Sequence, residues 1–340
     1  MKKSVLIVMS LFFLAIGLFV VFENYHKPRI LILHSYCNKY VWVKDINQGI
    51  KRELSKNNWF TAQYHYMHTD LFYEEDDLHR ASVAARQAIK QFRPDILLAI
   101  DDSAQELVGK YYVNDPKMKI VFAGINGEVT PYGYDKANNV TGIMEHKQFH
   151  PMKEMLAHLG QHLGHPPRFA HLSDHSMASI TDTAEAEKIT WDPLVYLGGF
   201  TVADFEEWKK KALELNGKID FLLVSGYRQL AFGKGNADFV PPEEIMAWTL
   251  KNVEVPVIGL NVFNSRDGAM ISLGVSPYEQ GEVATHMALE LLAGKQISDL
   301  PIRPAKMYVI SMSKRTLKRY GVTPPLILEA FARASNNYFE

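Results

Sequence analysis

Small polar side chains, mixed with aromatic and charged ones, follow several apolar runs that are typical of buried strands. Ser35 and Tyr36 follow the run 29–34, and the pair Asp102 and Ser103 comes soon after the run 96–100. An aspartate at such a place could hold an ammonium group, an arginine could hold a carboxylate, and aromatic faces suit flat or cationic groups. We expect the ligand-binding residues to be Ser35, Tyr36, Trp42, Asp102, Ser103, Asn126, Ser173, Asp174, Tyr227, Arg228 and Asn261.

Each of these residues also has an ordinary structural interpretation. Ser103 and Glu106 have the spacing of a helix capping box, so Asp102 and Ser103 could cap a helix, contact a ligand, or do both. The same alternatives hold for Ser173 and Asp174. The aromatic candidates could pack in the core, and Arg228 could be a surface residue. The combined chemistry of an acid, an arginine and aromatic rings indicates a small organic ligand such as an amino acid.

Sequence signatures of catalysis and cofactor binding are missing. The chain has no phosphate-binding P-loop, no nucleophile elbow and no helical zinc signature. His158 and His162 have a spacing that could hold a metal, but no carboxylate is well placed beside them, so we expect no metal site. Cys37 is the single cysteine, which excludes an internal disulfide. We therefore expect a binding protein without a cofactor, and we regard an enzyme as the least favoured class.

Strands and helices that alternate must position these residues. Apolar runs predict strands at 29–34, 60–67, 96–100, 119–123, 139–143, 168–172, 194–197, 220–224, 255–260, 268–272 and 304–310. Helical periodicity predicts helices at 43–56, 76–92, 103–112, 151–163, 176–188, 202–215, 242–250, 276–293 and 314–320. This alternation predicts an α/β protein with two doubly wound lobes, each built on a parallel sheet. Ligands of such sheets bind at the carboxyl ends of the strands, so we expect the site between the lobes.

The N-terminal segment indicates export. Ser4 to Phe22 is an uncharged and almost wholly apolar run of 19 residues, and two lysines precede it. Residues 1–27 are either a cleaved signal peptide or an uncleaved anchor that holds the protein to the inner membrane through residues 4–22. The remaining chain is expected in the periplasm. The formal net charge of the whole chain is −1, which argues against a nucleic-acid partner.

Four stretches of this sequence, in their order and spacing, resemble a known family. They are 32–36 with Trp42 and 49–50; 94–104; 139–142; and 268–274 with Gly281 and 294–301. Together they resemble the ABC-transporter substrate-binding proteins of the tryptophan/tyrosine-binding type. The same domain occurs as the extracytoplasmic sensor of some bacterial histidine kinases. The variants His34-Ser35-Tyr36 and Asp101-Asp102-Ser103 look more like that sensor branch.

The resemblance implies a periplasmic-binding-protein fold of type I, with two lobes joined by a three-segment hinge. It implies one lobe from residues 28–142 plus about 264–300, and another from 143–263 plus about 301–330. The implied function is to close on a small organic ligand and deliver it to an ABC permease. The alternative is a membrane-anchored sensory subunit that presents the ligand state to a histidine kinase or a similar membrane signalling partner.

Overall fold

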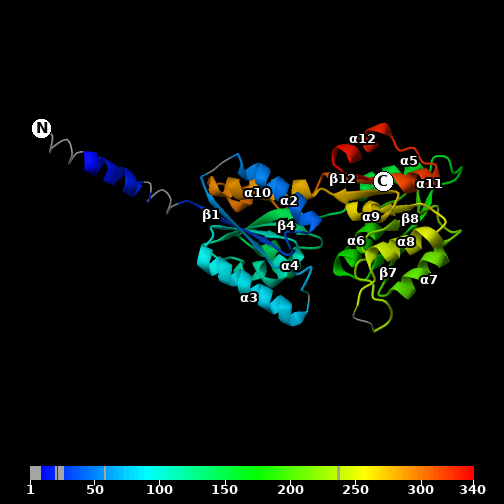
Figure 1. Cartoon of the computed structure of the whole chain (residues 1–340), viewed down its shortest axis with the longest axis horizontal. Coiled ribbons are helices and arrows are strands. Elements are labelled where there is room, and N and C mark those ends of the chain that lie inside the picture. Colours follow the sequence, from blue (N-terminus) through cyan, green and yellow to red (C-terminus); the bar gives the residue numbers. More distant parts are fainter. Residues whose placement is uncertain (1–8, 20, 22–26, 57–58, 73, 236–237) are drawn as a thin grey trace. The chain divides into compact units, whose positions relative to one another are not determined.

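The protein consists of two compact units that each draw on separate stretches of chain. The computed structural model describes residues 9–19, 21, 27–56, 59–72, 74–235 and 238–340. Unit 1 contains Met1–Met144 and Pro277–Arg303, and unit 2 contains Glu145–Ser276 and Pro304–Glu340. The chain therefore passes from one unit to the other three times, and each unit depends on segments that are distant in sequence (Figure 1).

Unit 1 is built on a six-stranded sheet in the order β11-β5-β4-β3-β1-β2. The neighbouring pairs from β5 to β2 are parallel. The strands are β1 (Arg29–His34), β2 (Thr61–Tyr66), β3 (Ile96–Ile100), β4 (Lys119–Ile125), β5 (Val140–Met144) and β11 (Arg303–Pro304). The helices are α2 (Val41–Leu54), α3 (Glu75–Phe92), α4 (Asp102–Leu107) and α10 (Pro277–Leu292), with short 3-10 turns at Gly109–Tyr112, Thr130–Tyr132, Tyr134–Lys136 and Ile297–Asp299.

The two faces of this sheet are covered by different helices. Leu31 and Leu33 of β1 form a core cluster with Ala85 and Ile89 of α3. Figure 1 shows α3 and α4 on one side of the sheet and α2 with α10 on the other. Because helices cover both faces, β1 and β3 are almost wholly buried, which explains why their sequences are unbroken apolar runs.

Two glycines allow α2 and α10 to touch backbone to backbone. A Cβ atom on Gly281 would lie 2.2 Å from the carbonyl oxygen of Ile46, and one on Gly49 would lie 2.4 Å from the carbonyl oxygen of Tyr278. Both distances are shorter than any real Cβ contact, and the opposing atoms are backbone atoms that no side-chain rotation can move. The close approach of these helices therefore requires glycine at both positions.

Unit 2 is built on a seven-stranded sheet in the order β13-β12-β10-β9-β8-β6-β7. The β10–β12 pair is antiparallel and the other pairs are parallel. The strands are β6 (Arg168–Asp174), β7 (Val195–Val202), β8 (Phe221–Val224), β9 (Val257–Gly259), β10 (Ile271–Val275), β12 (Tyr308–Ser313) and β13 (Tyr338–Phe339). The helices are α5 (Phe149–Leu159), α6 (Met177–Lys188), α7 (Phe205–Leu215), α8 (Pro242–Asn252), α9 (Val262–Asp267), α11 (Lys314–Tyr320) and α12 (Leu326–Ala334).

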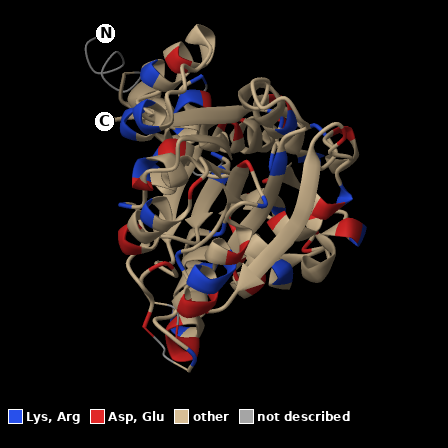
Figure 2. Cartoon of the chain, turned by 90° about the vertical axis from the view of Figure 1, so that its right-hand side faces the viewer, with Lys and Arg blue, Asp and Glu red and all other residues tan. Residues whose placement is uncertain are grey.

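Alternating residues of β8 divide the core of unit 2 between the two faces of the sheet. Phe221 and Leu223 join a cluster with residues of α5 and α12, whereas Leu222 and Val224 join a cluster with residues of α7 and α8. In Figure 2 the central strands carry few charged residues, and Lys, Arg, Asp and Glu lie on the surrounding helices and loops. Unit 2 is thus a sheet between two helical layers.

The predicted fold class, two doubly wound lobes on parallel sheets, is confirmed, and some elements differ. The helix predicted at 103–112 is interrupted at Val108, and α9 and α12 were not predicted. Residues 264–276, which the sequence analysis grouped with the first lobe, lie in unit 2, because β10 pairs with β9 and β12 of that unit.

The predicted export or anchor segment lies only partly within the described residues. Residues 9–19 are helical, and their apolar side chains are exposed. Positions 1–8, 20 and 22–26 of the segment are outside the described residues. Among the helices of the described ranges, none has both the length and the hydropathy that a membrane crossing needs.

Candidate functional site

In unit 1 the candidate site residues lie where β1, β3 and β4 end side by side. Ser35 is fully buried just after β1. Its Oγ donates to the carbonyl oxygen of Ile100 at 2.8 Å and accepts the N–H of Ala104 at 2.8 Å. The hydroxyl thus connects β1 to the end of β3 and to the first turn of α4. Both of these bonds are internal, so Ser35 shapes the strand edge.

Replacing Ser35 by alanine is expected to lower the free energy of unfolding by about 1–3 kcal/mol, because the two hydrogen bonds of its buried hydroxyl are lost at about 0.5–1.5 kcal/mol each. Denaturant unfolding of the two proteins measures this difference. Ser103→Ala is the matched control, since Ser103 is partly exposed and its loss should change stability by less than about 0.5 kcal/mol. Equal stabilities for the two variants would contradict this role for Ser35.

Asp102 and Asn126 contact each other, as their positions at neighbouring strand ends suggested. Oδ2 of Asp102 accepts the side-chain amide of Asn126 at 2.9 Å and its backbone N–H at 3.3 Å. Oδ1 accepts the hydroxyl of Tyr132 at 2.8 Å. Burial, and then the adjacent Asp102, raises the pKa of Tyr132 well above its usual value. Asp102 is half-buried, and Tyr132 is a member of this group that the sequence analysis missed.

Asp101, also missed as a site residue, positions Trp42. Its buried side chain accepts the indole N–H of Trp42 at 2.8 Å. Its backbone φ of +67° lies in a region that costs non-glycine residues energy, and such strain gathers at functional sites. The ring of Tyr36 packs edge-to-face against Tyr40 at 5.4 Å. The strand edge of unit 1 therefore places the Asp101 carboxylate beside Trp42 of α2, with Tyr36 and Tyr40 in the loop between β1 and α2.

In unit 2, Ser173 and Asp174 are buried at the end of β6. One carboxylate oxygen of Asp174 accepts the hydroxyls of Ser176 and Ser179, each at 2.6 Å, and the other accepts the backbone N–H of Gln229 at 3.1 Å. The Oγ of Ser173 lies 3.5 Å from the hydroxyl of Thr183. These two residues hold the start of α6 and the loop after β8 in place.

Tyr227 and Arg228 share one carboxylate partner, Asp267. The Tyr227 hydroxyl donates to Oδ2 of Asp267 at 2.7 Å, and the Arg228 guanidinium donates to the same oxygen at 3.0 Å. Tyr227 is fully buried, and burial together with Asp267 raises its pKa far above the usual value. The guanidinium of Arg228 lies over the ring of Phe263, 4.3 Å from its centroid. Tyr227 is therefore a core residue here, and Arg228 already has an anionic partner.

Asn261 leads to a buried charge cluster that the sequence analysis did not identify. The ammonium of Lys147 donates to the side-chain oxygen of Asn261 at 2.9 Å and to Glu145 at 3.0 Å. Burial opposes the charge of Lys147, but Asp182, Glu145 and Glu185 outweigh burial and raise its pKa. Burial also raises the pKa of Asp182 to about 7, although Lys147 counteracts this.

We call Glu145, Lys147, Asp182 and Glu185 the Lys147 cluster. Its side chains come from the first segment of unit 2 and from α6, and His146 lies 3.7 Å from Glu185. No sequence spacing marks these residues as a group, because tertiary packing alone brings them together. The cluster places more negative than positive formal charge beside Asn261.

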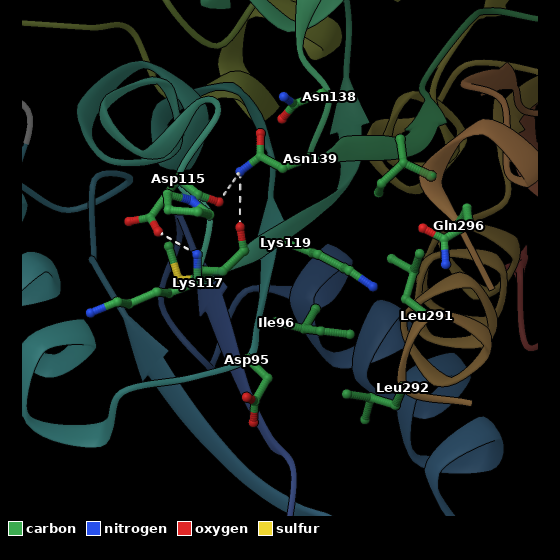
Figure 3. Close-up of a pocket in the computed structure, with 13 residues that line it drawn as sticks. Asp95, Ile96, Asp115, Lys117, Lys119, Asn138, Asn139, Leu291, Leu292 and Gln296 are labelled. Carbon is green, nitrogen blue, oxygen red and sulfur yellow. Dashed lines mark hydrogen bonds between the residues drawn. The ribbon is translucent and has the colours of Figure 1, made fainter. Parts of the chain in front are cut away.

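A cavity of about 360 Å³ lies at the opposite edge of the unit 1 sheet (Figure 3). It is lined by residues near the beginnings of β3, β4 and β5, among them Ile96, Lys119 and Asn139. The Asn139 amide donates to the carbonyl oxygens of Tyr112 and Met118, each at 2.9 Å. Its polar group is thus used to hold the surrounding loop, and the candidate site residues lie at the other edge of the sheet.

Residues 243–334, which run from α8 to the end of α12, match the family model of the ABC transporter substrate-binding protein. This confirms the predicted family resemblance. The matched part includes Asn261 and the α9 segment that carries Asp267. No curated protein matches the chain at a significant level.

Solved structures extend the likeness in fold over most of the chain. CD0873 of Clostridium difficile, a substrate-binding protein with adhesive properties, is 16% identical with a TM-score of 0.67 and covers 88% of this chain and 96% of its own. A conserved domain protein of Vibrio cholerae is 15% identical with a TM-score of 0.65 and covers 92% and 100%. An ABC domain in complex with L-Trp from Streptococcus pneumonia is 16% identical with a TM-score of 0.58 and covers 89% and 98%. At these identities the likeness shows the substrate-binding-protein fold of type I.

Proposed function

We propose that this chain is an extracytoplasmic solute-binding protein that closes on a small organic ligand, of the amino-acid class, and delivers it to an ABC permease. The observation that carries the proposal is the sequence match to ABC transporter substrate-binding proteins over residues 243–334. The fold likeness to substrate-binding proteins supports it over the rest of the chain. Closure would follow from a ligand that has higher affinity for the closed state than for the open one.

The ligand chemistry in this proposal starts from the strand edge of unit 1. Asp102 is half-buried, and the aromatic residues Tyr36 and Trp42 lie at the neighbouring strand end. An ammonium group suits the carboxylate, and a flat side group suits the rings. Ser103 and Asn126 would add polar contacts. The same edge of unit 2 would contribute Asn261, which is partly exposed, whereas Ser173, Asp174 and Tyr227 are buried and hold neighbouring segments in place.

The contacts of Arg228 argue against its expected role in ligand binding. This guanidinium was expected to hold a ligand carboxylate, but it is paired with Asp267 and stacked on Phe263. A ligand carboxylate would therefore have to compete with Asp267. The ammonium and the flat group of the ligand are accordingly the better supported parts of the proposal.

A thermal-shift screen of the full chain with amino acids and small amines tests the ligand class. A ligand present at about 100 times its dissociation constant is expected to add about 2.7 kcal/mol of stability, which gives a clear rise in Tm. Asp102→Ala should abolish the rise. The control is Asp95→Ala, because Asp95 accepts the Arg29 N–H at the other edge of the same sheet. A ligand that shifts Asp102→Ala as strongly as the unchanged chain would refute the role of Asp102.

The alternative of a sensory subunit is motivated by the apolar helix at residues 9–19, which could keep the protein at the membrane. Measurements of ligand uptake and of kinase phosphorylation in cells that lack the protein distinguish the two functions. Loss of uptake of the ligand found in the screen supports delivery to a permease. Normal uptake, together with loss of ligand-dependent phosphorylation in a membrane histidine kinase, supports the sensory subunit instead.

A further inference from the structure

Helix α12 turns large apolar side chains outward. Leu326 is 82% exposed, Ile327 61% and Phe331 58%. Leu328 and Ala332 of the same helix pack on the core of unit 2. The exposed positions are one, four and five residues apart, so they share the helix face opposite the core. Single exposed apolar residues are common, but three large ones on one short helix form a patch that calls for a partner.

The chain around this patch is strongly basic. Residues 304–340 contain six lysines and arginines and two glutamates, whereas the whole chain has a net charge of −1. Four of the basic residues, Lys314, Arg315, Lys318 and Arg319, are exposed on α11. Both glutamates are already paired, Glu329 with Arg333 and Glu340 with Lys314. A positive excess is therefore left on this part of unit 2.

The apolar and basic groups belong to one surface. Helices α11 and α12 both pack against β12 and β13, and Arg333 of α12 lies over the ring of Tyr338 in β13 at 3.7 Å. Figure 2 shows lysine and arginine residues close to the C-terminus, where β13 ends. We define the α11–α12 surface by Leu326, Ile327 and Phe331 with Lys314, Arg315, Lys318 and Arg319.

We propose that the α11–α12 surface binds an anionic phospholipid membrane. Apolar side chains on one face of a helix enter the boundary between headgroups and acyl chains, and basic side chains attract the lipid phosphates. The apolar run of residues 4–22 would bring the chain to a membrane.

A second copy of the chain fits this surface less well. In a symmetric dimer the same patch faces itself, so the α11 lysines and arginines of both copies would be brought together. Like charges at an interface are unfavourable. Anionic headgroups instead complement the basic residues, and their acyl chains accommodate Leu326, Ile327 and Phe331. The basic residues and the exposed apolar residues therefore both favour a membrane as the binding partner.

The experiment uses the full chain with a polarity-sensitive fluorophore on a single introduced cysteine. Ala330→Cys places the probe on the exposed part of α12, and the native Cys37 is buried. Leu213→Cys is the control, because Leu213 is exposed on α7, which covers the other face of the unit 2 sheet. Both proteins keep the same N-terminal segment, so attachment through that segment affects them equally.

The probe at position 330 is expected to shift its emission to the blue on vesicles of phosphatidylcholine with phosphatidylglycerol, and to shift little on phosphatidylcholine alone. The probe at 213 should not shift on either. Lys318→Gln is expected to weaken the response at 330 about fivefold, because each basic residue near an anionic surface contributes about that factor.

Any of four results would overturn the proposal. The first three are an equal shift on neutral vesicles, an equal shift at position 213, and a shift that follows protein density rather than lipid charge. The third result would identify a second copy of the chain as the occupant. A shift that appears only when a permease is present in the vesicles would likewise assign the surface to a protein partner.

Discussion

Gly281→Val is expected to destabilise the protein by about 3 kcal/mol or more, at the upper end of overpacking effects. The new side chain would have to occupy the space of the Ile46 carbonyl oxygen, because even a Cβ would lie 2.2 Å from it. The obstacle is backbone on α2, so relief requires the two helices to separate. Chemical denaturation monitored by circular dichroism measures the loss.

A matched control separates the clash with α2 from a general effect of replacing glycine by valine. Gly233→Val makes the same substitution where no atom lies within 4 Å of the position that a Cβ would take, and it should change stability little. Gly281→Ala is a finer test, since alanine favours helices by about 1 kcal/mol over glycine and would stabilise a helix that was not packed so closely. A gain in stability for Gly281→Ala would show that α2 and α10 do not approach each other as described.

Lys147→Met should cost about 3–5 kcal/mol at pH 8, the range seen when one partner of a buried ion pair is removed. The variant leaves Glu145, Asp182 and Glu185 without the cation that they face in unit 2. Burial raises the pKa of Asp182 to about 7, so this carboxyl group is neutral near pH 5 and part of the loss should be recovered there. Unfolding curves at the two pH values provide the comparison.

Lys295→Met is the control for this substitution, because the pair of Lys295 with Glu290 lies on the surface and should contribute less than about 1 kcal/mol. A Lys147→Met protein that loses the same stability at pH 5 and pH 8 would disprove the charge explanation.

Asp182 is expected to give the unchanged protein its own pH dependence. Burial raises its pKa from 3.8 to about 7 in the folded state. The unfolded chain therefore loses this proton near pH 4, while the folded chain keeps it to about pH 7. The contribution to stability is complete below pH 4 and declines as the pH rises to about 7. In Asp182→Asn this part of the pH profile should be flat, and an unchanged slope would contradict the assignment to Asp182.

Elements with a strong local pattern could be predicted from the sequence. β1 and β3 are buried on both faces, so their sequences are unbroken apolar runs that are typical of a buried strand. α9 has only six residues, too few for a helical period to show, and its capping box of Asn261 and Asn264 is visible only in the structure. α12 was not predicted, although Glu329 and Arg333 lie four residues apart on one side of it and its other positions are apolar.

Only some contacts of the candidate site could likewise be predicted from the sequence. The contact of Asp102 with Asn126 follows from the parallel order of β3 and β4, which alternating strands and helices could predict. The Lys147 cluster depends on packing between the first segment of unit 2 and α6, and its members have no common spacing. Arg228 could be selected for its charge, but its partner Asp267 lies 39 residues away in sequence and could not be foreseen.

The interrupted course of the chain sets an order for maturation after synthesis. α10 and β11, which complete unit 1, follow the long central stretch of unit 2 in the sequence. While the chain is synthesised from its N-terminus, α2 has no partner for its glycine face until residues 277–292 have emerged. Unit 1, whose synthesis begins first, therefore cannot complete its fold before most of unit 2 has been synthesised. Neither unit is encoded by one contiguous stretch of the gene. To produce one unit alone, its two coding segments would have to be joined by a linker.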